Sequence, residues 1–324
     1  MYDGLLLPTD GSPHTTTAAG HALALARAFD ATVHVLRVAD IDGAAGLFDA
    51  GGVDDEFVER VEQEAAATVE RTASLLAAAE RVETAVVDGD PGEGIVEYGT
   101  EHGVDGIVMG THGRRGLRRF VAGSVTEEVV RTTTVPVFTV RRADEDGDDE
   151  APADESEPLA PDDLPRYETV LLPTDGSDTA AATVDHAIAV AEAFDGELHA
   201  LSVVDPSSTG ALPEAGPSES VVESLVEQAQ HAVASVADRA AGAGVEIHTE
   251  VQQGFPARTI LGYAEEQGVD IVVAGTHGRT GLGRVLLGST AEHLVRRAEM
   301  PVCVVPAANR DAAMEEGDGG GDRP

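Results

Sequence analysis

Short apolar runs alternate with amphipathic stretches along the first part of the chain. Between Ala18 and Phe29, apolar side chains recur at spacings of three and four residues, which predicts a helix beginning at Ser12 and Pro13. Runs rich in Val, Ile and Leu predict strands. The expected strands are 5–7, 32–38, 82–87, 105–109 and 135–140, and the expected helices are 13–29, 57–79, 91–102 and 124–131.

This regular alternation of strand and helix determines the fold class. Parallel strands need helical crossovers, and strands that are covered on both faces are apolar along their whole length. The pattern therefore predicts an α/β protein with an open, doubly wound, Rossmann-like parallel sheet.

The chain is an internal duplication. LLLPTDGS at 5–12 matches VLLPTDGS at 170–177, and GTHGRRGLRRFVAGS at 110–124 matches GTHGRTGLGRVLLGS at 275–289, all at one offset, 175 − 10 = 165. A repeat this long means two whole domains rather than a solenoid. We expect domains at 1–142 and 167–306, a flexible tail at 307–324 and, at 143–166, a disordered linker rich in acidic residues and proline.

The charge of the chain limits its partners. The net charge is −38, with 59 acidic residues against 21 basic ones, and only 3% of residues are aromatic, so nucleic acid is not an expected partner. Such an acidic surface is typical of proteins from a salt-loaded, halophilic cytoplasm. No apolar run approaches the roughly 18 residues of a membrane span, no signal peptide is evident, and we expect a cytoplasmic protein. The single cysteine, Cys303, lies in an apolar run and is expected to be buried and inert.

The two repeated motifs predict one crevice in each half. Ligands of doubly wound sheets bind beyond the carboxyl ends of the strands, where the strand order reverses. The PTDG motif follows the first strand and the glycine-rich motif follows the fourth, so neighbouring strands would bring them together. Glycines bring backbone N–H groups close to a phosphate, and the helix that starts at Ser124 adds its positive dipole end.

Each of these residues also has a simpler interpretation. Glycines after a strand can merely form turns. Asp10 and Asp175 can cap a helix or form a turn, or their carboxylates can accept a hydrogen bond from a ribose hydroxyl or a base amine. The loop arginines can pair with phosphate or lie on the surface. Repetition of the motifs indicates common ancestry but does not choose between these interpretations.

PTDGS after the first strand, with G-x2-G-x9-G-[ST] after the fourth, resembles the universal stress protein family, and both halves carry both motifs. The chain is similar to a tandem two-domain member of the ATP-binding type. The resemblance implies a five-stranded parallel sheet of order 3-2-1-4-5 with about four helices in each half. It also implies that 135–140 pairs with 302–305 inside one chain as a pseudo-dimer, which leaves further homodimerisation open.

The resemblance implies an adenine nucleotide such as ATP, with or without Mg²⁺, as the ligand of each half. The implied nucleotide-binding residues of the first half are Pro8, Thr9, Asp10, Val38, Met109, Gly110, Gly113, Arg114, Gly123, Ser124, Val125 and Thr126. Those of the second half are Pro173, Thr174, Asp175, Val203, Ala274, Gly275, Gly278, Arg279, Gly288, Ser289 and Thr290. Ala291 stands where the first half has Thr126, so we expect the second site to lack one hydroxyl and to bind more weakly.

The expected function is nucleotide binding by a stress-response or regulatory protein, without efficient turnover. The alternatives are a slow Mg²⁺-dependent ATP hydrolase, with the metal at Asp10 or Asp175, and a scaffold in which one domain has lost its ligand. No catalytic residue and no resident metal ligand is identified, and His112 and His277 are interpreted as turn or rim residues. His34 and His199 lie in strand patterns and are expected in the core or at an interface.

Overall fold

The computed structural model describes residues 1–41, 55–111, 123–141, 157–177, 180–209, 219–276 and 287–307. Strand and helix alternate through both halves. The first half contains β1 (Gly4–Pro8), α1 (Pro13–Phe29), β2 (Thr32–Ala39), α3 (Asp55–Leu75), β3 (Val82–Asp88), α4 (Pro91–Glu101), β4 (Gly106–Gly110), α5 (Ser124–Thr132) and β5 (Val137–Val140).

The second half repeats this order after a short 3₁₀ helix, η1 (Pro161–Asp163). It contains β6 (Thr169–Pro173), α6 (Ala180–Ala193), β7 (Glu197–Val204), η2 (Pro206–Thr209), α7 (Glu219–Ala243), β8 (Ile247–Gln253), α8 (Pro256–Gln267), β9 (Ile271–Gly275), α9 (Ser289–Arg297) and β10 (Val302–Val305). Among the described residues, no helix is long and apolar enough to cross a bilayer.

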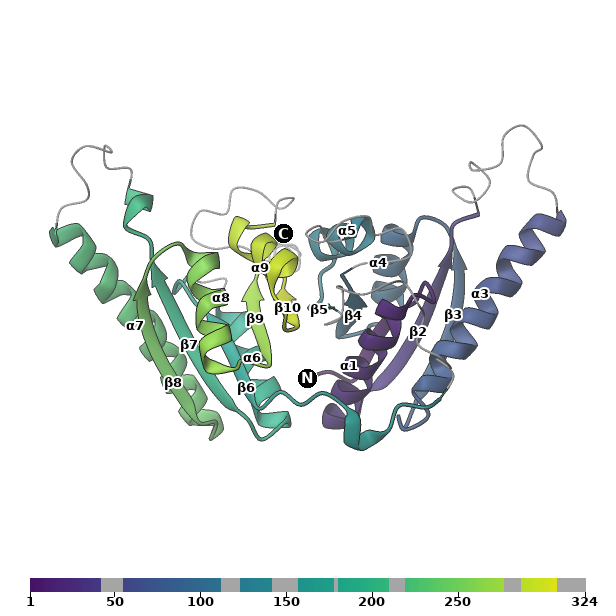
Figure 1. The fold of residues 1–324 in the computed structure, drawn as a ribbon, viewed down its shortest axis with the longest axis horizontal. Helices are drawn as coiled ribbons and strands as arrows, with labels where there is room; N and C mark the ends of the chain where they lie inside the picture. The colour runs from purple at the N-terminus through teal and green to yellow at the C-terminus, as the bar shows by residue number, and fades with distance from the viewer. Residues whose placement is uncertain are drawn as a thin grey trace, which may run out of the picture.

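All ten strands form one sheet, in the order β3-β2-β1-β4-β5-β10-β9-β6-β7-β8. Each half therefore has the predicted strand order 3-2-1-4-5, and every pairing within a half is parallel. The halves meet at an antiparallel pair in which Cys303 of β10 lies opposite Phe138 of β5. The predicted pairing of the two fifth strands is confirmed, and Figure 1 shows the halves as two wings with β5 and β10 at the centre.

Helices cover both faces of the sheet, and successive strand residues point to opposite faces. Leu5 and Leu7 belong to a core that includes residues of α1, α3, α6 and α7, whereas Leu6 belongs to a core on the side of α4, α5, α8 and α9. Each core contains residues of both halves. Cys303 is fully buried in the first of them, as expected, and burial raises the pKa of its thiol.

Two reciprocal hydrogen bonds join the halves beneath the central strand pair. The hydroxyl of Tyr2 lies 2.7 Å from Nδ1 of His186, and the hydroxyl of Tyr167 lies 2.7 Å from Nδ1 of His21. These residues are related by the repeat offset, since 2 + 165 = 167 and 21 + 165 = 186. The interface is thus a pseudo-twofold one, which supports the interpretation of an intrachain pseudo-dimer.

Acid should weaken this interface. Burial lowers the pKa of His21 from 6.5 to about 4, so between these values the unfolded chain binds a proton that the folded chain does not. The free energy of unfolding therefore keeps its full value above pH 6.5 and falls as the pH drops towards 4. The protonation of His21 accounts for a loss of up to about 3 kcal/mol. Urea unfolding at pH 7 and pH 4.5 should show a smaller acid loss for His21→Gln than for the wild type. Equal losses would contradict the prediction.

The segment between the domains differs from the expected disordered linker in its second part. Residues 143–156 lie outside the described residues, but Leu159 and Leu164 pack against the core, and η1 lies between them. The N–H of Leu159 donates to the carbonyl of Leu75 at 3.0 Å. This bond satisfies a carbonyl at the end of α3, which stops at Leu75 rather than at the predicted residue 79. The two leucines are the only large apolar residues of the sequence 143–166, and their packing anchors the second part of the segment.

Candidate functional site

A cavity of about 530 Å³ lies in the second half, at the carboxyl ends of β6, β7 and β9. The strand order reverses at β6, which pairs with β7 on one side and with β9 on the other. The start of α9 closes one side of the cavity, and α7 and α8 contribute apolar side chains such as Leu225 and Ile260. This is the position at which doubly wound sheets bind ligands, and the volume lies within the range of small-molecule sites.

The cavity brings together every implied second-half residue that the structure describes. These residues are Pro173, Thr174, Asp175, Val203, Ala274, Gly275, Gly288, Ser289 and Thr290. Gly278 and Arg279 lie outside the described residues, as does His277. The sequence interpretation missed other polar lining residues, namely Ser177, Thr183, Ser202, Asp205 and Thr276. Thr276 and Ser177 lie within the repeated motifs and could have been included on that ground.

Asp10 and Asp175 form turns, as the simpler of their two interpretations predicts. Oδ1 of Asp175 accepts the N–H of Ser177 at 2.9 Å, and Oδ1 of Asp10 accepts the N–H of Ser12 at 3.0 Å. The intervening residues, Gly11 and Gly176, have φ of 71° and 72°, a conformation that favours glycine. Asp175 nevertheless lines the cavity, so turn formation and ligand contact are compatible uses of one carboxylate.

Gly288 is the N-cap of α9, and its backbone does not require glycine. Its φ of −61° and ψ of 142° are open to any residue, and Ser or Asp would cap the helix with a side chain. Gly123 holds the same position before α5, with φ of −58° and ψ of 146°. A glycine that is not needed for the turn leaves space over the first helical N–H groups, which have no acceptor inside the helix. Such a helix start favours an anion.

Two buried hydroxyls near the crevices have no partner among the described residues. Oγ1 of Thr183 lines the cavity from α6, and the residue is only 2% exposed. Oγ of Ser12 is equally unpaired in the first half, and its counterpart Ser177 lines the cavity of the second. An unpaired buried hydroxyl is costly, and a polar ligand in the crevice would satisfy it.

The first half has the same backbone framework around its implied site. The N–H of Thr9 donates to the carbonyl of Leu36 at 2.8 Å, as that of Thr174 donates to Leu201 at 2.9 Å. Of the implied residues, Pro8, Asp10, Gly110, Gly123, Ser124 and Val125 are at least partly exposed, while Thr9, Val38, Met109 and Thr126 are buried. Gly113 and Arg114 lie outside the described residues, as does His112.

The hydroxyl of Thr126 is hydrogen-bonded to the backbone at the end of β4. It donates to the carbonyl of Gly110 at 2.8 Å, and the residue is 3% exposed. While it makes this bond, the Thr126 hydroxyl has no proton to donate to a phosphate, and the weaker binding expected from Ala291 stays a prediction. The two sites differ in other ways, since Ala18 stands where the second half has Thr183.

Comparison with known proteins identifies the family. The profile of the Universal stress protein family matches residues 1–141 and 166–306, and the chain belongs to this family as a tandem of two family domains. A universal stress protein of Methanocaldococcus jannaschii is 43% identical over 145 residues, which are 45% of this chain and 85% of the relative. A universal stress protein of Mycolicibacterium smegmatis is 31% identical over 205 residues, 61% of this chain and 60% of that relative.

A solved structure shows the same two-domain fold. The crystal structure of a universal stress protein from Archaeoglobus fulgidus matches with a TM-score of 0.65, over 95% of this chain and 97% of that chain. At 23% sequence identity, this likeness concerns the fold alone.

Proposed function

We propose that this universal stress protein binds an adenine nucleotide in each half and acts as a stress-response or regulatory protein without efficient turnover. The observation that carries the proposal is the cavity of about 530 Å³, which gathers the described part of the implied second-half site at the strand reversal. One nucleotide per half follows from the repeated framework.

The chemistry of the cavity suits the parts of a nucleotide. Backbone N–H groups at the start of α9 and the space above Gly288 suit phosphate oxygens. Val203, Ile260 and other apolar side chains suit the flat faces of a base. The carboxylate of Asp175 and the hydroxyl of Thr183 suit ribose hydroxyls or base amines.

The lining supports binding more than catalysis. Within the part of the chain that the structure describes, no histidine or cysteine lines the cavity. Mg²⁺ usually takes one or two carboxylates together with substrate phosphates, and Asp175 is a carboxylate that could meet it beside a bound nucleotide. Arg279 of the repeated motif would meet the phosphates as a charged donor.

Replacement of Thr183 by valine tests this assignment, because ligand affinity and stability should move in opposite directions. Thr183→Val removes an unpaired buried hydroxyl, so the ligand-free protein should gain about 1 kcal/mol of unfolding free energy. In calorimetric titration with ATP, the second-half affinity should fall by roughly tenfold through the lost hydrogen bond.

Thr100→Val is the matched control. Thr100 is exposed on α4, where its hydroxyl donates to the carbonyl of Val96 at 2.8 Å, so neither stability nor affinity should change appreciably. A Thr183→Val protein with unchanged ATP affinity would show that this hydroxyl does not meet the ligand.

A further inference from the structure

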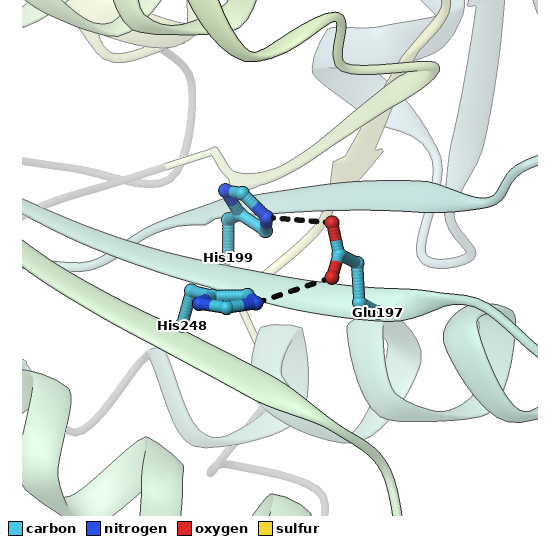
Figure 2. Close-up of side chains that lie close together, drawn as sticks. All are labelled: Glu197, His199 and His248. Atoms are coloured by element: carbon cyan, nitrogen blue, oxygen red, sulfur yellow. Dashed lines mark hydrogen bonds and ion pairs between the residues drawn. The ribbon is translucent and has the colours of Figure 1, made fainter.

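A cluster of metal-ligating side chains lies at the start of β7 and β8, at the opposite end of these strands from the carboxyl ends that line the cavity. Glu197 and His199 are two residues apart on β7 and share one face, and His248 is the partner of His199 in the parallel register of β8. Figure 2 shows all three side chains converging, with one oxygen of the carboxylate facing each ring. Nothing in the proposed nucleotide site uses them.

The distances match those of a small coordination sphere. Nε2 of His199 lies 3.1 Å from Oε1 of Glu197, and Nε2 of His248 lies 3.2 Å from Oε2. One ligand atom from each of the three residues falls within 4.8 Å of the others. In a tetrahedral zinc site, bonds of about 2.0–2.1 Å place neighbouring donor atoms about 3.4 Å apart. The two imidazole-to-carboxylate distances, each to a different oxygen of Glu197, are close to that value.

A further residue fixes the more buried ligand. The hydroxyl of Tyr263, on α8, lies 2.8 Å from Nδ1 of His199, and His199 is 5% exposed. Metal-bound histidines almost always have such a partner on the second ring nitrogen, because it sets the tautomer and the ring orientation.

The other side of the cluster is open to solvent. The side chain of His248 is 53% exposed and that of Glu197 is 36% exposed. An ion could therefore enter from outside, and a fourth coordination position would remain for water or another small ligand.

We infer that Glu197, His199 and His248 form a site for a divalent transition metal of the zinc type, with three protein ligands and one outward-facing position. Two imidazoles and one carboxylate favour Zn²⁺, Co²⁺, Ni²⁺ or Cu²⁺, whereas Mg²⁺ and Ca²⁺ prefer oxygen ligands alone. The bound ion links β8, which lies at the end of the strand order, to its neighbour β7.

The first half provides an internal comparison. The repeat offset places Thr32 at the position of Glu197 and Glu83 at that of His248, since 197 − 165 = 32 and 248 − 165 = 83. His34 and Tyr98 correspond to His199 and Tyr263, with 3.3 Å between Nδ1 of His34 and the tyrosine hydroxyl. The first half thus retains the histidine and its tyrosine but lacks this His-His-Glu ligand set.

Cobalt titration of the full chain, stripped of metal by a chelator and free of nucleotide, tests the inference. The wild type should bind one equivalent of Co²⁺ with the strong visible absorption of a four-coordinate ion, and Zn²⁺ should displace it. His248→Gln changes an exposed residue and should weaken binding at least tenfold while the circular dichroism spectrum stays unchanged. Glu197→Gln should weaken binding similarly.

His231→Gln is the matched control, because His231 is exposed on α7 and lies outside the cluster. Its Co²⁺ affinity and spectrum should equal those of the wild type. The inference is overturned if the wild type shows no saturable one-equivalent site, or if folded His248→Gln and Glu197→Gln bind Co²⁺ as the wild type does. Neither result depends on nucleotide binding.

Discussion

Replacing Gly288 by aspartate is expected to abolish nucleotide binding in the second half while the fold remains intact. The backbone of Gly288 already has N-cap dihedral angles that aspartate adopts readily, and aspartate is among the best N-caps. The stability of the chain should therefore be unchanged or a few tenths of a kcal/mol higher. The new carboxylate would occupy the space over the start of α9, where the proposed phosphate lies.

The expected loss of affinity is large because two like charges would meet at close range. At a separation of about 4 Å near a protein surface, the repulsion of one charge pair is of order 4 kcal/mol, so affinity should fall at least about a hundredfold. Calorimetric titration with ATP should show one site fewer per chain in Gly288→Asp. Gly123→Asp should have the same effect on the first half.

Gly242→Asp controls for the added charge. Gly242 lies on α7, and a side chain there would meet no atom within 4 Å, so the variant adds the same charge in open space. Its ATP binding should match that of the wild type. If Gly288→Asp folds normally and also binds ATP like the wild type, the phosphate does not lie over the start of α9.

The second large effect is expected at the junction of the two halves. Phe138 is fully buried on β5, opposite Cys303 of β10, and its ring meets the edge of Tyr2 with centroids 5.5 Å apart. Phe138→Ala would leave a cavity in a core that contains residues of both halves. The free energy of unfolding should fall by about 4 kcal/mol, as for other buried phenylalanines, and urea unfolding measures it.

Phe255→Ala makes the same chemical change on the surface. Phe255 is 66% exposed, so the free energy of unfolding should change by less than about 0.5 kcal/mol. A similarly small loss for Phe138→Ala would show that the central strands do not share a packed core.

Most of the fold was predictable because the sequence pattern is strong and occurs twice. The apolar run from Leu5 to Leu7 and the helical spacing up to Phe29 specify local elements that the structure contains. The strand order came from the family resemblance rather than from the pattern. The element ends were less predictable, because Leu159, which pairs with the end of α3, lies far along the chain.

The polar residues of the site were less predictable for a different reason. Motifs that occur in both halves were recognised through the repeat, but Thr183 has Ala18 as its counterpart, so the repeat gave no reason to select it. The pairing of His199 with His248 depends on the register of β7 and β8, which separate stretches of sequence do not specify. His199 was expected in the core or at an interface, and its burial confirms the core placement while its contact with Glu197 was not foreseen.

The measurement that tests the nucleotide proposal most directly is calorimetric titration of the full chain with ATP, with and without Mg²⁺, beside a Gly123→Asp/Gly288→Asp double variant. The wild type should show saturable binding with two sites per chain, and the folded double variant should show none. Absence of saturable binding by the wild type, or equal binding by the folded double variant, would contradict the proposal that the two crevices hold adenine nucleotides.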